Sequence, residues 1–192
     1  MNSSLNRKFV RLQIRILVLF GQRERALERV GDLLDMHAAD PYALATRAHL
    51  LAELGDKAGA QQALQQLVAV QPTQPAGWFN LGYLSEEMGQ LEQAEAAFRR
   101  ATEIDPQLDR AWYGLALSLI RQRRFDEAVT ALRKNTELQP MSPYGWYQLA
   151  RVHVDRQEPD EAAKIIRHLR KFEPKVAAQL ERETGLGQQA QA

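Results

Sequence analysis

The sequence has no cysteine, no excess of either charge and no long apolar run, and each absence excludes a class of protein. Without cysteine the chain forms no disulfide, thiolate metal site or catalytic thiol, which suits a reducing compartment. Lys and Arg number 25 against 24 Asp and Glu, so the net charge does not favour binding to nucleic acid or to acidic membranes. We therefore expect a cytoplasmic protein that binds no nucleic acid.

The most apolar stretch near the N-terminus, residues 9–20, is interrupted by Arg11, Gln13 and Arg15. A secretory signal needs an apolar region without charge. The uninterrupted part, residues 16–20, is also far shorter than the roughly 20 residues of a membrane-spanning helix. The sequence therefore predicts neither a signal peptide nor a transmembrane helix.

A repeat runs through the chain, because all three tryptophans, Trp78, Trp112 and Trp146, are 34 residues apart. At this period the chain divides into five units: residues 7–40, 41–74, 75–108, 109–142 and 143–176. The twentieth position is alanine in every unit: Ala26, Ala60, Ala94, Ala128 and Ala162. The thirty-second position is proline in the last four: Pro72, Pro106, Pro140 and Pro174. Such a period is typical of stacked supersecondary units.

The third unit carries a series of spaced residues: Trp78, Leu81, Gly82, Ala94, Phe98 and Pro106. This series resembles the tetratricopeptide repeat, although Ser85 stands where that family usually has tyrosine. The fourth and fifth units follow the pattern, the second is weaker, and the first keeps mainly Gly21 and Ala26. The resemblance covers about 170 residues. It implies an all-α fold, a right-handed α-solenoid of about five helix–turn–helix repeats.

The same columns make physical sense as helix pairs. Small residues such as Gly82, Ala116 and Ala150 allow the first helix of a unit to approach the alanine of its partner. Gly21, Gly55 and Gly89 stand where each first helix should end, because glycine adopts the left-handed conformation easily.

Two later units depart from this turn pattern. Arg123 and Gln157 stand at the glycine position there, so we expect looser turns. Asp40 and Ser142 each precede a proline and are predicted N-cap acceptors. The first turn of each later second helix carries an acid that favours the helix dipole: Glu92, Asp126 and Asp160.

Stacking of the units predicts one solenoid over residues 1–184 with a concave face as the candidate site. Residues 175–184 have apolar positions at helical spacing and are predicted to form a capping helix. Residues 185–192 are predicted to be a disordered tail.

The sequence contains no recognisable catalytic or metal-binding motif. The four histidines, His37, His49, His153 and His168, are scattered and are expected on the surface or in the groove. No glycine-rich phosphate loop is present. We therefore expect a protein that is not an enzyme and that holds no metal or cofactor.

The resemblance also implies which residues line the concave face, because positions 2, 5, 6, 9, 12 and 13 of the first helix do so in this family. Tyrosine and arginine at such positions suit peptide binding. Tyr42 is expected at the rim, and the alternative for the other rings is packing between first helices. The predicted groove residues are Phe79, Asn80, Tyr83, Arg110, Tyr113, Arg121, Tyr144, Tyr147, Gln148 and Arg151.

Some family members bind the C-terminal carboxylate of chaperones through lysine, asparagine and arginine in these columns. The corresponding residues here are Ala45, His49, Asn80, Arg110 and Gly114. Only Asn80 and Arg110 keep that chemistry, so we expect a different ligand.

The first unit has an apolar patch, Ile16, Leu17, Leu19 and Phe20, that follows four basic residues. Three explanations stay open. The patch is buried against the second unit and residues 1–6, or it mediates self-association or docking of a partner, or a basic amphipathic helix rests on a membrane surface.

Two functions follow from these expectations. The first is an adaptor, scaffold or assembly factor whose groove binds a peptide or helix of another protein. The second is a structural subunit of a larger complex, membrane-associated or not, docked through the apolar first repeat. Homo-oligomers through that repeat belong to the same alternative.

Overall fold

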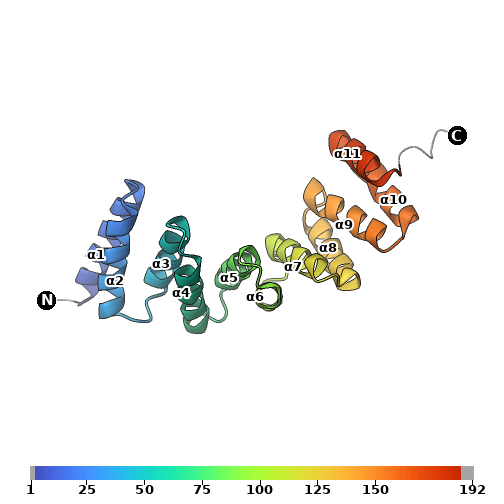
Figure 1. The fold of residues 1–192 in the computed structure, drawn as a ribbon. Helices are drawn as coiled ribbons and strands as arrows, with labels where there is room; N and C mark the ends of the chain where they lie inside the picture. Colours follow the sequence, from blue (N-terminus) through green and yellow to red (C-terminus); the bar gives the residue numbers. More distant parts are fainter. Residues whose placement is uncertain (1–2, 187–192) are drawn as a thin grey trace. The chain divides into compact units, whose positions relative to one another are not determined.

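The computed structural model describes residues 3–186, which form eleven α-helices and no strand (Figure 1). The predicted all-α helical-repeat solenoid is thus confirmed as the fold class. The helices are α1 (Ser3–Leu19), α2 (Arg23–Met36), α3 (Pro41–Glu53), α4 (Lys57–Val70), α5 (Pro75–Glu87), α6 (Leu91–Ile104), α7 (Asp109–Arg121), α8 (Phe125–Leu138), α9 (Pro143–Asp155), α10 (Pro159–Leu169) and α11 (Pro174–Thr184).

The chain forms two compact parts, Met1–Gly89 and Gln90–Ala192, called here the N-terminal and C-terminal parts. In the N-terminal part each helix from α1 to α5 packs against the next one along the chain. In the C-terminal part the same holds from α6 to α11, and α11 also packs against α9. The predicted capping helix is therefore present as α11, whereas the predicted tail lies largely outside the described residues, at 187–192.

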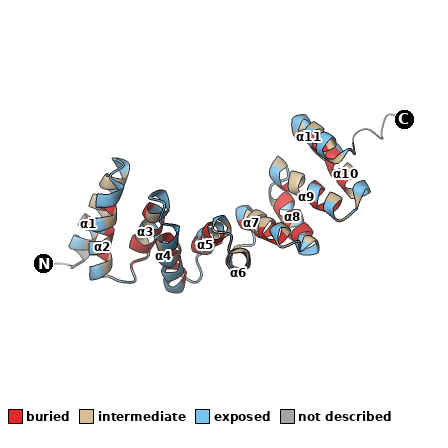
Figure 2. Ribbon diagram, viewed as in Figure 1, coloured by how far each residue is buried: buried red, intermediate tan, exposed pale blue. Residues whose placement is uncertain are grey.

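Figure 2 shows that the helices have buried and exposed faces. The alanine of the twentieth position is fully buried in all five repeats. Ala116 and Ala150, the small residues of two first helices, are also fully buried. Helix axes approach to about 8–10 Å only where the side chains between them are small. Within each part, the alanine column therefore explains why the two helices of a pair pack closely enough to bury their apolar faces.

The tryptophan and proline columns are linked by one hydrogen bond that recurs. The indole Nε1 of Trp78 donates to the carbonyl oxygen of Pro72 at 3.0 Å. Trp112 donates to Pro106 at 3.0 Å, and Trp146 donates to Pro140 at 2.8 Å. Each bond satisfies a carbonyl in the loop between consecutive repeats. The tryptophan and the proline of these repeats therefore stabilise the same loop.

Gly114 on α7 makes room for a core ring. A Cβ atom at this position would lie 2.5 Å from Cζ of Phe98, which is almost fully buried on α6. No side chain fits at that separation without displacing the ring. Packing against Phe98 therefore explains why position 114 carries no polar side chain.

The turns at Arg123 and Gln157 are not looser, which corrects the expectation from the sequence. Arg123 has φ 59° and Gln157 has φ 62°, close to the left-handed values of the glycines that end α1, α3 and α5. The turn at Gln157 has a bond from Gln157 N to Val154 O of 2.9 Å, matching Gly55 N to Ala52 O at 3.1 Å. These two non-glycine residues accept backbone strain so that the turn keeps its geometry.

Helix caps agree with the sequence in part. Oδ1 of Asp40 accepts from the N–H of Ala43 at 3.1 Å, as predicted. Ser142 makes no side-chain cap bond, so its prediction as an N-cap acceptor is wrong, although α9 begins at Pro143 as expected. The predicted acids, Glu92, Asp126 and Asp160, all lie in first turns.

We predict that Gln157→Gly stabilises the protein by about 0.5–1 kcal/mol, because release of left-handed strain exceeds the added backbone entropy of glycine. Gly55→Gln is the matched control, since a Cβ there meets nothing within 4 Å and adds only strain. It should destabilise the protein by a similar amount. Urea unfolding of both variants measures this, and a loss of stability in Gln157→Gly would contradict the account.

Candidate functional site: a groove in the N-terminal part

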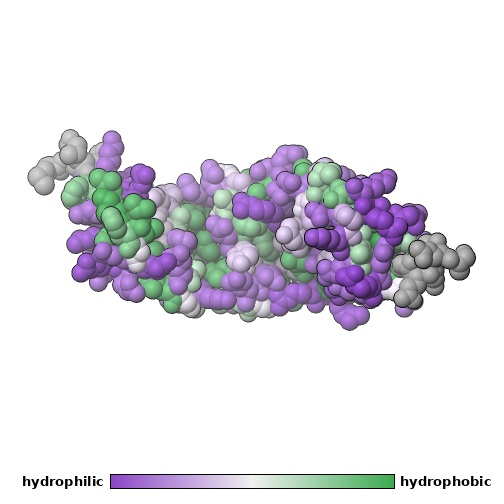
Figure 3. Space-filling model, turned by 90° about the horizontal axis from the view of Figure 1, so that it is seen from above, coloured by the Kyte–Doolittle hydropathy of each residue, from purple (hydrophilic) through white to green (hydrophobic). Residues whose placement is uncertain are grey.

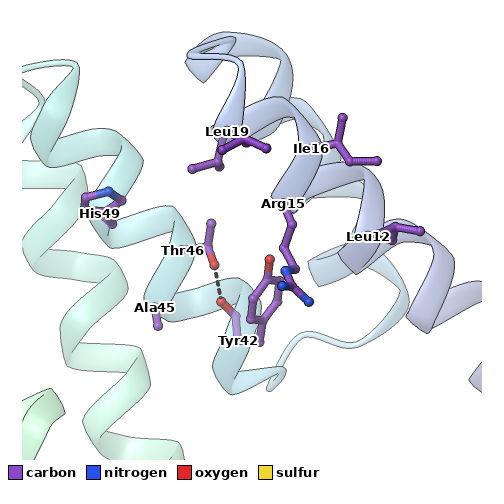
Figure 4. Close-up of a pocket in the computed structure, with 9 residues that line it drawn as sticks. Leu12, Arg15, Ile16, Leu19, Tyr42, Ala45, Thr46 and His49 are labelled. Carbon is purple, nitrogen blue, oxygen red and sulfur yellow. Dashed lines mark hydrogen bonds between the residues drawn. The ribbon is translucent and has the colours of Figure 1, made fainter.

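A recess of about 670 Å³ lies between α1 and α3 in the N-terminal part (Figure 4). The α1 wall presents Leu12, Ile16 and Leu19, and Tyr42 lies on the α3 side. The full lining is Leu12, Arg15, Ile16, Val18, Leu19, Tyr42, Ala45, Thr46 and His49. The α3 residues occupy positions 2, 5, 6 and 9 of the second repeat, which are the groove columns expected from the family.

The recess continues along α3 toward α5. A second pocket of about 240 Å³ shares Ala45 and His49 with the first and is also lined by Asn80, Tyr83 and Glu87. A third, of about 360 Å³, shares Ala45 and Tyr42. Because Ala45 lines all three, they form one surface, which we call the N-terminal groove.

The α1 side of this groove is an exposed apolar surface (Figure 3). Leu19 is 81% exposed and Phe20 is 72% exposed, values far above those of a core residue. Large exposed apolar side chains on α1 and at the first residue after it are Phe9, Leu12, Ile16, Leu19 and Phe20. A contiguous patch of this kind marks an interaction site more often than a chance surface.

The apolar patch predicted from the sequence divides into two groups. Leu17 and Val18 are partly buried and pack against the core formed with Val10 and Ile14. Ile16, Leu19 and Phe20 stay exposed, so burial against the second repeat, one of the three explanations left open, does not hold for them. The helix period explains the division, since adjacent residues face different sides of a helix.

Asp40 anchors α1 to the start of α3 and so fixes one wall of the groove. Its carboxylate is fully buried, 2.8 Å from Nε of Arg7 and 2.9 Å from a guanidinium nitrogen of Arg11. Burial alone raises the pKa of Asp40, but the hydrogen bonds from Ala43 and Arg11 and the charges of Arg11 and Arg7 outweigh it and lower that pKa. Two of the four basic residues on α1 are therefore paired with an acidic residue of the same chain.

We predict that Asp40→Asn costs about 1–3 kcal/mol of stability at neutral pH, because the ion pairs are lost while the cap is kept. A lowered folded pKa stabilises the protein above the unfolded pKa, and this contribution disappears as the pH falls through the folded value. The difference in melting temperature between wild type and variant should therefore shrink as the pH is lowered from neutral to below about 4.

The exposed Asp35 on α2 gives a control for this pH series. Asp35→Asn should follow the wild-type curve at every pH. A difference between Asp40→Asn and wild type that stays constant down to acidic pH would contradict the assigned role of the carboxylate.

Asn80 and Tyr83, two of the groove residues expected from the family columns, line the N-terminal groove. The phenol of Tyr83 is 54% exposed and donates to Oε1 of Glu87 at 3.1 Å, which raises its pKa. Phe79 is half-buried and lines none of the three pockets. Tyr42, expected at the rim, instead lines two of these pockets.

The other predicted groove residues lie in the C-terminal part. Burial raises the pKa of Tyr113, and its hydrogen bond with Gln148 offsets only part of that effect. Tyr144 is 70% exposed, and Arg110 and Arg121 are also exposed.

Tyr147 and Arg151 contact the capping helix. The Tyr147 hydroxyl donates to Oε2 of Glu183 at 2.7 Å, and Arg151 lies 3.2 Å from the same hydroxyl and 3.8 Å from that carboxylate. Because Glu183 is 36 residues away from Tyr147, no sequence pattern announced this contact. A ligand that used these two side chains would have to displace the carboxylate.

The histidines do not assemble a metal site. His49 is exposed in the groove, as expected, but His153 is buried, with Nδ1 2.6 Å from Oε2 of Glu158. His168 packs between Trp146 and Phe172. Within residues 3–186, no group of three or more His, Asp or Glu side chains could hold a metal ion.

No helix among the described residues is both long enough and apolar enough to cross a membrane.

Helix pairs at a fixed period with an open groove on their first helices define the class of helical-repeat interaction proteins. Residues 45–109 and 86–146 match two family models described as "Tetratricopeptide repeat". The chain belongs to the tetratricopeptide repeat family.

Solved structures share the fold at low sequence identity. MamA 41-end from Desulfovibrio magneticus RS-1 is 21% identical with a TM-score of 0.77, covering 92% of this chain and 96% of that one. A further MamA structure is 17% identical, with a TM-score of 0.80 and 97% coverage of both chains. YrrB, described as a TPR protein with an unusual peptide-binding site, is 16% identical, with a TM-score of 0.78 and 88% coverage of both. No curated protein sequence matches this chain.

Proposed function

We propose that the protein is a non-enzymatic adaptor, scaffold or assembly factor that holds a segment of a client polypeptide in the N-terminal groove. The observation that carries this proposal is the groove itself. Three pockets share Ala45, and the first of them has an α1 wall with large apolar side chains that face solvent, Leu12, Ile16 and Leu19. Covering such side chains releases about 25 cal/mol for each Å² removed from water, so a bound segment is favoured.

The adaptor function and the structural-subunit function, which the sequence assigned to different surfaces, would use the same surface. The sequence assigned the groove to repeats three to five and the apolar patch to the first repeat. Leu12, Ile16 and Leu19 belong to α1, yet they line the same recess as the groove columns of α3. A structural subunit docked through its first repeat would therefore use the surface that an adaptor would use.

The residues of the C-terminal part stay a second candidate surface. Tyr144 and Met141 are exposed there beside the start of α9, and Tyr147 and Arg151 face the carboxylate of Glu183. The N-terminal groove is favoured over them because its α1 wall has large exposed apolar side chains, whereas Tyr147 and Arg151 already contact Glu183.

Affinity capture from the source lysate tests the proposal with two matched variants. Ala45→Glu places a charged side chain in the middle of the groove without entering the core, since Ala45 is exposed. Ala96→Glu makes the same change at an exposed position of α6. We expect a client that the wild type and Ala96→Glu retain and that Ala45→Glu loses by at least about tenfold.

A client retained equally by all three proteins would place the interaction elsewhere and contradict the proposal. Circular dichroism of each variant checks that the helix content is unchanged. Light scattering of the purified wild type separates the two roles, because a stable monomer removes the need for an obligate partner subunit.

A further inference from the structure

We propose that the occupant of the N-terminal groove is an acidic amphipathic helix of another protein. This inference rests on the proposed function and specifies the chemistry of its client. Three features of the groove support it: the spacing of its apolar ridge, the supply of hydrogen-bonding groups, and the sign of its charge.

The apolar ridge has the spacing of a helix-packing surface. Leu12, Ile16 and Leu19 are four and three residues apart on α1, so they form one row about 10 Å long. Rows of this spacing pack into the grooves of another helix at axial distances of about 8–10 Å. Tyr42 and Ala45 on α3 provide the opposite wall (Figure 4). The recess therefore suits a helix that has apolar side chains on one face.

The supply of hydrogen-bonding groups favours a helix over an extended peptide. The recess between α1 and α3 has four polar side chains in its lining, Arg15, Tyr42, Thr46 and His49. Thr46 already donates to the backbone oxygen of Tyr42 at 2.7 Å. An extended segment carries an N–H and a C=O at every residue, and burying them unpaired costs free energy. A helix satisfies its own backbone and can bury an apolar face against this wall.

The charge at the groove favours an acidic partner. Residues 1–22 contain four basic residues and no acidic one. Asp40 pairs with Arg7 and Arg11, which leaves Lys8 and Arg15 as the exposed cations of α1. Arg15 lines the recess and has no acidic partner among the described residues. Charges of opposite sign on the partner would lie within reach of this guanidinium.

The acidic residues nearest to the groove, Glu53 and Glu87, do not pair with Arg15. Glu53 is 3.6 Å from Nε2 of His49 and 2.6 Å from Nε of Arg23. Glu87 lies at the α5 end and is 3.3 Å from Nζ of Lys57. Both carboxylates have cationic partners, so the uncompensated charge of the recess is the positive charge near α1. We infer that acidic residues of the bound helix lie on its α1 side.

A selection from an unbiased library of displayed peptides of roughly 18 residues, about five helical turns, tests this inference on the intact protein. Clones that also bind Ile16→Ser are removed, because Ile16 is half-exposed on the ridge and its loss leaves the core intact. Leu19→Ser, at a still more exposed position, replaces it if Ile16→Ser unfolds. Enriched peptides should have apolar residues at helical spacing and a net negative charge.

Fluorescence anisotropy of the most enriched peptide then measures the charge dependence. Arg15→Glu should weaken binding at least about tenfold, and Arg133→Glu, at an exposed position on α8, should leave it unchanged. Circular dichroism should show that the peptide gains helix when bound. Enrichment of proline-rich, neutral or basic peptides would overturn the inference, as would equal binding to wild type and Arg15→Glu.

Two other occupants give distinct results in parallel measurements. Sedimentation of the wild type, but not of Ile16→Ser, with phosphatidylserine-containing vesicles would show a membrane surface and overturn the inference. A wild-type oligomer that Ile16→Ser dissolves would show a second copy of the chain and overturn it too. If the lysate client is lost in Ala45→Glu while no acidic helix is selected, the proposed function stands and only the partner chemistry is wrong.

Discussion

Close approach of paired helices at the alanine column is the constraint on which the rest of the structure depends. A side chain larger than alanine at Ala26 or Ala60 would separate the two helices of the pair, because both residues are fully buried. Close pairing places the first helices at regular intervals along the N-terminal part. The groove is the space that these first helices leave between them, so its position follows from packing of the pairs.

The two faces of α1 give this regular surface its chemical character. One face, which includes Val10 and Ile14, is buried where α1 packs on α2, and the other face is exposed. Asp40 holds the helix in place through Arg7 and Arg11. The exposed face then lies opposite α3, and the same helix packs on α2 and forms a wall of the groove.

Local and periodic features could be predicted from the sequence. The 34-residue period gave the helix pairs, and the glycine positions gave the ends of α1, α3 and α5. Asn80 and Tyr83 could be assigned to the groove because their columns depend only on position in the repeat. The same columns in the second repeat contain Tyr42, Ala45, Thr46 and His49, but that repeat lacks the tryptophan that marks the later ones.

Contacts between distant residues could not be predicted in this way. The bond between Tyr147 and Glu183 spans a full repeat and the turn to the capping helix. The pairing of Asp40 with Arg7 and Arg11 depends on how α1 docks in three dimensions. Arg123 and Gln157 adopt the left-handed conformation because the surrounding turn determines it, although their own preference opposes it. Each of these contacts and conformations depends on tertiary packing.

The most direct test of the central claim uses the absence of cysteine from the chain. A single Ala45→Cys variant can carry a photo-activated cross-linker in the middle of the N-terminal groove, and Ala96→Cys can carry it on α6. After irradiation in the source lysate, the account predicts one protein adduct at position 45 and none at position 96. Equal adducts at both positions, or an adduct at position 96 alone, would contradict the groove as the binding surface.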